Sequence, residues 1–396
     1  MPTLYPRMVL DFGAGDLFRL AFLRGQEMTD MAAIDRRLAG GRPFAVALSV
    51  RTAFDLLLTA LGIHPGDEIV LSAINIRGMA SIARDHGLKV RVADIDPATL
   101  AVPPREVERL LSERTRLVVI APTFGTRHDL SGIAAICHAR GIPLVEDAAQ
   151  TWEGSYRGSP DADVVLFSFG PAKTATALGG AVAIFRDPQA VERFRRAERG
   201  LPPTSALWLS WRIVKFAVFL LFLRPTLMGV VDRLGRLLGI DTDAAFSGAA
   251  RSFPQSKPMA AIRRRLTAPM RHLMAHKLTV HPGAEARRRR ALRFAELLER
   301  PDAVPGAACP DNSFWLTAVT AARPEALVGT LRSAGFDASR KASNIVALAD
   351  DETGTPPRAA AMMASLVYLP LTRYTGPGEL ARIAAIVNRH AASEGS

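Results

Sequence analysis

Apolar strands alternate with helix-like runs along residues 45–185, and this alternation restricts the fold more than any other feature of the sequence. The segments EIVLSA (68–73), RLVVIA (116–121) and IPLVE (142–146) are apolar almost throughout. Strands of this kind are buried on both faces, and the runs between them suit crossover helices that join parallel neighbours. The pattern predicts an α/β domain with a mainly parallel sheet covered by helices.

Polar side chains occur where these strands end. Ser49–Thr52 follows the strand at 45–48 and opens a helix, and Asp147 and Ser168 end two later strands. Ligands of open parallel sheets bind at the carboxyl ends of the strands, so we expect these groups at one rim. A turn that opens a helix also offers N–H groups to a phosphate, although many such turns are simple helix caps.

A lysine, Lys173, follows Ser168 closely and completes a set of groups that pyridoxal phosphate (PLP) chemistry needs. In that chemistry a lysine carries the cofactor as a Schiff base, and a carboxylate keeps the pyridine nitrogen protonated. Taken singly, Asp147 is explained as a helix cap, Ser168 as a strand-end hydroxyl and Lys173 as a solvated lysine. Their combination at one predicted rim favours the cofactor.

Positive charge is concentrated in one part of the chain. The net charge is +12, and residues 193–300 hold 22 Lys+Arg against 7 Asp+Glu, a local +15 that leaves 12 − 15 = −3 elsewhere. Such a block indicates an anionic partner. Its arginine clusters at 263–265 and 287–290 lack interleaved aromatic residues, and no recognised nucleic-acid module is present, so we expect no nucleic acid.

Cysteine usage and the first residues indicate the compartment. Cys137 and Cys309 are far apart and in no metal-ligand spacing, which favours a reducing environment and predicts no metal site. Residues 1–16 contain no apolar run with a cleavage pattern, so we expect no signal peptide and a cytoplasmic location.

Residues 205–223 and 225–240 form two successive apolar runs. The first has 19 residues, close to the ~20 that cross a bilayer, but Arg212 and Lys215 lie in its middle, where each costs about 2.5–3.5 kcal/mol. We therefore expect a helical hairpin that lies on a surface, with its cations snorkelling. Two interpretations stay open, an anionic membrane surface at the inner face of the cytoplasmic membrane and a buried subunit interface.

Several motifs together resemble those of the DegT/StrS-like sugar aminotransferases, which are PLP enzymes of fold type I. They are ALGIHPGDEIVL, ADIDPATL, VEDAAQ, FSFGPAKTATALGGAVAI and SLVYLPL, and they extend over nearly the whole chain outside the hairpin. The resemblance implies a large domain with a mainly parallel seven-stranded sheet, a smaller α+β C-terminal domain and a homodimer. The expected parts are an N-terminal arm (1–40), the PLP-binding large domain (41–200), a basic, apolar helical insertion (201–285) and the C-terminal domain (286–396).

The resemblance also implies roles for individual residues. Lys173 would carry the cofactor and move the substrate's α-proton, and Asp147 would pair with the pyridinium nitrogen. Ala149 would pack on the ring face, and Gln150 would bind the ring hydroxyl. The cofactor's phosphate would be held by Ser49, Arg51, Thr52 and Ser168.

Two departures from the family pattern affect what the site can hold. Val50 stands where the phosphate turn usually has glycine, and the hairpin replaces an asparagine-bearing motif that reaches the neighbouring subunit's site. The predicted function is PLP-dependent transfer of an amino group from a small-molecule donor, glutamate by resemblance, to a keto group on a sugar or lipid-linked polar acceptor. The alternatives are a soluble nucleotide-linked acceptor, and a catalytically degenerate PLP-fold protein that acts as a membrane-associated binding or scaffold subunit.

Overall fold

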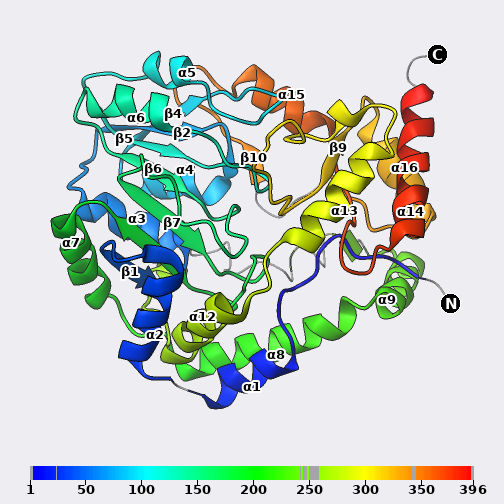
Figure 1. Ribbon diagram of the computed structural model, residues 1–396, viewed down its shortest axis with the longest axis horizontal. Coiled ribbons are helices and arrows are strands. Elements are labelled where there is room, and N and C mark those ends of the chain that lie inside the picture. Colours follow the sequence, from blue (N-terminus) through cyan, green and yellow to red (C-terminus); the bar gives the residue numbers. More distant parts are fainter. Residues whose placement is uncertain are drawn as a thin grey trace.

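A seven-stranded sheet lies at the centre of the computed structural model, which describes residues 3–393 except 24, 241, 244–247, 249–257 and 341–344 (Figure 1). The strand order is β1-β8-β7-β6-β5-β2-β4. Neighbours from β7 to β4 run parallel, whereas β8 is antiparallel to both β7 and β1. The predicted mainly parallel sheet is confirmed. Its strands are β1 (Phe44–Ala47), β2 (Glu68–Ser72), β4 (Lys89–Ala93), β5 (Thr115–Ile120), β6 (Leu144–Asp147), β7 (Val164–Ser168) and β8 (Ala181–Phe185).

Helices between the strands cover the sheet. The first of them, α3, packs against β1, β7 and β8 and also against α4 and α7. Its apolar face includes Phe54 and Leu57, which are fully buried. Because Ser49 caps α3 directly after β1, the start of this helix lies near the sheet edge. The covering helices are α3 (Val50–Ala60), α4 (Arg77–Asp85), α5 (Pro104–Glu108), α6 (Ser131–His138) and α7 (Pro188–Arg199).

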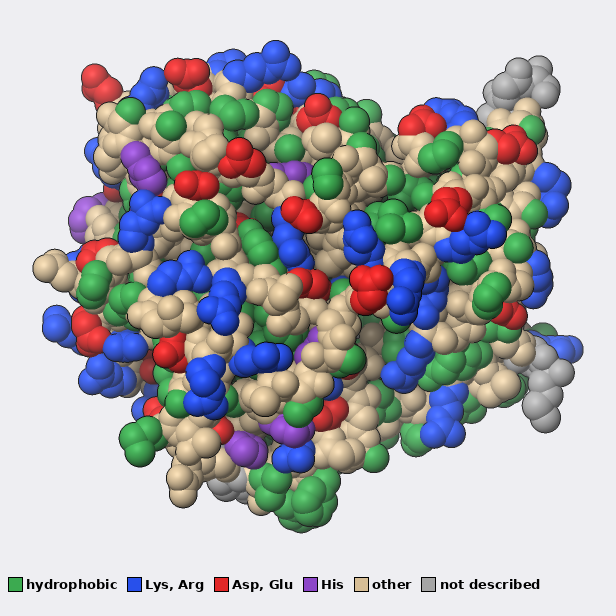
Figure 2. Space-filling model, in the orientation of Figure 1, with side chains coloured by type: hydrophobic (Ala, Val, Ile, Leu, Met, Phe, Trp, Pro, Cys, Tyr) green, Lys and Arg blue, Asp and Glu red, His purple; other side chains and the backbone are tan. Residues whose placement is uncertain are grey.

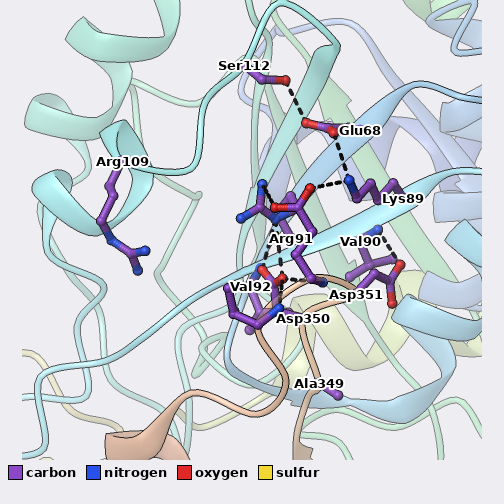
Figure 3. A network of polar contacts seen from close by, with 12 residues as sticks. Glu68, Lys89, Val90, Arg91, Val92, Arg109, Ser112, Ala349, Asp350 and Asp351 are labelled. Atoms are coloured by element: carbon purple, nitrogen blue, oxygen red, sulfur yellow. Dashed lines mark hydrogen bonds and ion pairs between the residues drawn. The ribbon is translucent and has the colours of Figure 1, made fainter.

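Strand β4 forms one edge of the sheet, and carboxylates from the C-terminal part bind its outward N–H groups (Figure 3). Val90 donates to Asp351 and Val92 donates to Asp350, each at 2.8 Å. Arg91 adds an ion pair to Asp350 at 3.1 Å. An exposed strand edge is open to pairing with another chain, and these contacts close it.

The C-terminal part has its own hydrophobic cluster, which contains Phe294, Phe336 and Ile383. Strands β9 and β11 pair antiparallel within it, and β10 pairs with β3 (Ile74–Ile76) of the large domain. The four predicted domain boundaries stay predictions. The elements of this part are α13 (Glu285–Glu296), a 3-10 turn (Pro301–Ala303), β9 (Ala318–Thr320), α14 (Pro324–Ser333), β10 (Ile345–Ala347), α15 (Pro357–Ser365), β11 (Leu366–Tyr368) and α16 (Pro377–Ala392).

The N-terminal arm and the predicted insertion pack against each other. In Figure 1 the arm runs from the C-terminal part across the molecule to α1, which lies against α8 at the lower edge. Part of the predicted insertion lies outside the described residues. The elements here are α1 (Ala14–Phe22), α2 (Glu27–Ile34), a π-helical turn (Asp35–Ala39), α8 (Ala206–Phe222), α9 (Pro225–Leu237), α11 (Pro258–Ile262) and α12 (Ala268–Val280).

Helices α8 and α9 form an L and not the expected antiparallel hairpin, because their axes meet at 92°. Among the described residues no single helix has the length and apolarity of a membrane span, and this bent pair meets that test only by its combined length and composition. The expectation that Arg212 snorkels outward is wrong. Its side chain turns into the protein and is 5% exposed.

The opposite side of α8 carries a row of exposed apolar side chains. Hydrophobic side chains gather along the lower edge of the molecule, where α1 and α8 lie (Figure 2). Trp211 is 66% exposed and Leu207 82% exposed. We call this row the outer face of α8, and it consists of Leu207, Trp211, Val214, Val218 and Leu221.

Candidate active site

A cavity of about 490 Å³ opens at the carboxyl ends of β6 and β7. Its wall comes from the sheet rim, the N-terminal arm, α8 and the C-terminal part. The structure therefore brings together residues that are distant in sequence. Of the predicted site residues, those that line this cavity are Ser49, Arg51, Asp147, Ala149, Gln150, Ser168 and Lys173.

Lys173 and Asp147 form the charged pair of the cavity. Burial lowers the pKa of Lys173 to about 8, even though the negative charge of Asp147 opposes this shift. Burial raises the pKa of Asp147 to about 6, and the charge of Lys173 and the N–H of Ala149 oppose that shift. An amine and a carboxyl group whose pKa values move toward neutrality are suited to exchange protons near physiological pH.

Trp315, from the C-terminal part, fixes the position of the lysine. The Lys173 ammonium lies 3.9 Å from the centre of the Trp315 ring, which is a cation–π distance. The indole N–H donates to the carbonyl of Ala172 at 2.9 Å, so the ring and the lysine segment are held together. Sequence reasoning missed Trp315, because no motif surrounds it and only the fold brings it to Lys173.

The phosphate seat predicted at Ser49–Thr52 is the N-terminus of α3. Ser49 is the helix cap, and its hydroxyl accepts from the Thr52 N–H at 3.1 Å. Thr52 itself is fully buried, and its hydroxyl donates to the carbonyl of Ile262 at 2.8 Å. Thr52 is not among the described residues that line the cavity. In this structure Thr52 links Ser49 to the insertion through these hydrogen bonds, whereas Ser49 and Arg51 line the cavity.

Ala149 and Gln150 follow Asp147 on the same turn. The Ala149 N–H donates to the Asp147 carboxylate at 3.1 Å, which fixes the turn after β6. The side-chain oxygen of Gln150 accepts from the Phe124 N–H at 3.0 Å. This bond orients the amide and leaves its NH₂ group as the donor for a ligand.

Three buried polar atoms in the cavity wall have no hydrogen-bond partner among the described residues. They are Asn75 Nδ2, Arg287 Nη2 and the Tyr368 hydroxyl. An unsatisfied buried polar atom is costly, and such atoms in a cavity indicate that a ligand completes them. The donor set fits a polar, anionic cofactor with an aromatic ring, since phosphate, ring hydroxyl and ring nitrogen each find a matching group here.

Arg287 adds a cation that the sequence did not single out as a site residue. Its Nε donates to the Ser313 carbonyl at 3.0 Å and its Nη1 to the Thr174 hydroxyl at 3.2 Å. Burial lowers its pKa to about 10. Arg290 and Arg373 also line the cavity, so the wall near the C-terminal part is strongly cationic.

The architecture and the paired lysine and carboxylate define the class of protein, an α/β fold of the PLP fold-type-I kind. Its fold is similar to that of the aminotransferase TlmJ from Streptoalloteichus hindustanus, with a TM-score of 0.73, 22% identity and coverage of 99% of this chain and 100% of the other. It is also similar to the aminotransferase PseC of Helicobacter pylori, with a TM-score of 0.71, 14% identity and coverage of 98% and 100%. At these identities the likeness shows the fold.

Residues 22–200 match the family model of the DegT/DnrJ/EryC1/StrS aminotransferase family. The matched residues include Lys173 and Asp147, and the match confirms the resemblance that the motifs indicated.

Two curated relatives share part of this domain. The L-glutamine:2-deoxy-scyllo-inosose aminotransferase of Streptomyces fradiae is 34% identical over 39% of this chain and 37% of its own length. The UDP-2-acetamido-2-deoxy-3-oxo-D-glucuronate aminotransferase of Pseudomonas aeruginosa is 31% identical over 41% and 46%. The matched part spans less than half the length of each relative.

Proposed function

We propose that the protein is a PLP-dependent aminotransferase that converts a keto group on a sugar-type acceptor to an amine. The observation that carries this proposal is the buried pair of Lys173 and Asp147, which face one cavity with opposite pKa shifts. The match to the family model supports it. A likeness in fold to the protein Spr1654 of Streptococcus pneumoniae, solved in PLP and PMP forms, supports the choice of cofactor (TM-score 0.72 in both forms).

The cofactor, when bound, supplies an electron sink for the carbon that loses or gains a proton. Lys173 would bind the cofactor covalently, and its amine would then move the proton at that carbon. Its lowered pKa favours the neutral amine that both tasks need. Asp147 would hold a proton on the pyridine nitrogen, and Trp315 keeps the lysine in place.

The remaining site residues orient the ring and the phosphate. Ala149 would pack on one ring face, and the NH₂ group of Gln150 would bind the ring hydroxyl. The phosphate would lie at the N-terminus of α3, where Ser168 would donate its hydroxyl proton and Arg51 would add charge. Ser49 would donate its hydroxyl proton by turning it from Thr52 Oγ1 to the phosphate. Thr52 acts through Ser49, since its own hydroxyl is bound to Ile262.

The cationic wall favours an acceptor that carries a negative charge. Arg287, Arg290 and Arg373 line the cavity from the C-terminal part, and Arg287 Nη2 has no hydrogen-bond partner among the described residues. A phosphate fits this wall, and both nucleotide-linked and lipid-linked keto-sugars contain one. The donor is glutamate, whose carboxylates suit the same arginines.

The outer face of α8 supports association with the inner face of the cytoplasmic membrane. It is exposed in a single chain, and the described part of α8 contains no acidic side chain to repel anionic lipid. The arrangement favours a lipid-linked acceptor that enters from this side, since Arg212, Phe219 and Leu223 of the same region line the cavity. The chain acts as a homodimer, and if the dimer covers this face, membrane binding is excluded.

Cofactor binding tests the catalytic proposal. Purified protein with added PLP is expected to show the visible absorbance band of a covalently bound cofactor, and Lys173→Ala is expected to lose it. Added glutamate, or glutamine as the alternative donor, should bleach that band, and keto-acceptors of the two linked types should restore it. A protein that forms the band but does not respond to any donor would be a binding protein and not a transaminase.

Liposome flotation tests the membrane proposal. The protein is expected to float with vesicles that contain anionic lipid, and Leu207→Ser/Trp211→Ser is expected to remain at the bottom of the gradient. The matched control replaces Met28, an exposed apolar residue of α2 that is not part of α8. Equal flotation of both variants, or none by the wild type, would contradict the proposal.

A further inference from the structure

Arg212 lies on α8, but its side chain belongs to the cavity. Its Nε donates to the carbonyl of Leu178, in the segment that follows Lys173. The guanidinium carbon lies 4.8 Å from the centre of the Trp208 ring and 5.3 Å from that of Phe216. The side chain is thus held by two rings and one carbonyl, and it has little freedom to leave the wall.

The carbonyl that Arg212 binds belongs to a strained segment. Leu178 has φ +60°, a left-handed conformation that is costly for a residue with a branched side chain. The hydrogen bond from Arg212 therefore stabilises the backbone at the strained residue of the segment that follows Lys173. This contact alone explains a structural role, but it does not explain why a permanent cation lines the cavity.

A second guanidinium lies close enough to repel it. Arg51, at the first turn of α3, lines the same cavity. Burial first, and then the charge of Arg51, lowers the pKa of Arg212 to about 9. The charge of Arg51 also lowers the pKa of Lys173. Arg51 and Arg212 thus bring two positive charges to the wall of one cavity, and Arg51 lies at the positive end of α3, an arrangement that favours an anionic group of a ligand.

We infer that Arg212 is a ligand of the cofactor's phosphate, supplied by the inserted helix α8 of the same chain. This inference rests on the proposed function. It places Arg212 with Ser49, Arg51 and Ser168 around the end of α3, where all four side chains line one cavity. The insertion is then part of the cofactor site. It would provide, from the same chain, a positive charge for the phosphate.

The decisive comparison is between PLP and pyridoxal, which lacks the phosphate. Arg212→Met keeps an apolar stem between the two rings and removes the charge. Lost charge-assisted hydrogen bonds are expected to weaken PLP binding ~10–100-fold and to leave pyridoxal binding unchanged. Lys215→Met, one turn along α8 and not among the described residues that line the cavity, is the matched control and should change neither.

A second readout does not need the cofactor. Inorganic phosphate is expected to raise the melting temperature of the wild type and of Lys215→Met, but not that of Arg212→Met. If Arg212→Met loses PLP and pyridoxal affinity equally, or loses neither, Arg212 is not a phosphate ligand. If the wild type binds neither compound, the proposed function fails, and the phosphate shift alone decides whether Arg212 forms an anion site.

Labelling of the wild type covers the case in which Arg212→Met does not fold. Phenylglyoxal modifies accessible arginines, and the modified positions can be read by peptide mass spectrometry. PLP and phosphate are expected to protect Arg212, and pyridoxal is not. Equal protection by pyridoxal, or none by PLP, would overturn the inference.

Discussion

The proton on Lys173 controls the proposed chemistry, because only a neutral amine attacks a carbonyl carbon. Burial lowers the pKa of this lysine from 10.5 to about 8. At about pH 7.5 that shift raises the neutral fraction from roughly one in a thousand to roughly one in four, a gain of ~200-fold. The same shift corresponds to about 3 kcal/mol of differential interaction between the two protonation states.

Competitive labelling of the cofactor-free protein measures this titration directly. Trace acetic anhydride acetylates neutral amines, and peptide mass spectrometry reads the extent at each lysine from about pH 6 to 11. We expect Lys173 to titrate near 8, far below Lys89, whose pKa is raised by its hydrogen bond to Glu352. Asp147→Asn removes an attraction that favours the charged amine, so the Lys173 midpoint should fall further. A Lys173 that titrates together with Lys89 would refute the reasoning, and so would a midpoint that rises in Asp147→Asn.

Two further predictions concern stability. Asp350→Ala removes a buried carboxylate that accepts from backbone N–H groups and pairs with Arg91, and should cost about 3–5 kcal/mol in urea unfolding. Those hydrogen bonds outweigh the effect of burial and lower the pKa of Asp350 in the folded protein. Its contribution to the free energy of unfolding is therefore present above its ordinary pKa near 3.8 and is lost as the pH falls through the lower pKa of the folded state. A cost of Asp350→Ala that persists at still lower pH would contradict this. Phe216→Ala, on the buried side of α8, should cost about 3–5 kcal/mol, whereas Trp211→Ser on the outer face should change unfolding by less than about 0.5 kcal/mol. Equal costs at the two positions would show that α8 is covered on both sides.

The strands and the rim could be predicted because their signals are local. Continuous apolar runs mark β2, β5 and β6, and the residues that end β6 and β7 are placed at the rim by the topology of any parallel sheet. The pairing of β3 with β10 was not predictable in the same way. It joins two three-residue strands that are far apart in sequence, and neither has a pattern of its own.

The direction in which Arg212 points could not be predicted for a different reason. Helix α8 is apolar on nearly every side, so its periodicity does not show which side is buried. The cation was therefore expected to turn to water, but the cavity behind the helix offered it a carbonyl and two rings. The hydrogen bond of Thr52 could not be predicted for a similar reason, since the Ile262 carbonyl that its hydroxyl binds comes from the insertion. Trp315 and Arg287 come from the C-terminal part without any motif to mark them.

Helix α8 has one side on the cofactor cavity and another on the surface, and of the sequence neighbours Arg212 and Trp211 the first is buried and the second exposed. A partner that binds the outer face of α8 also restricts the motion of Arg212, and a ligand bound to Arg212 restricts the motion of the outer face. By thermodynamic reciprocity, the factor by which a docking surface changes cofactor affinity equals the factor by which the cofactor changes docking. Cofactor binding and docking of the outer face of α8 would then be coupled equilibria. Cofactor-free protein would dissociate from the docking surface more readily than cofactor-bound protein.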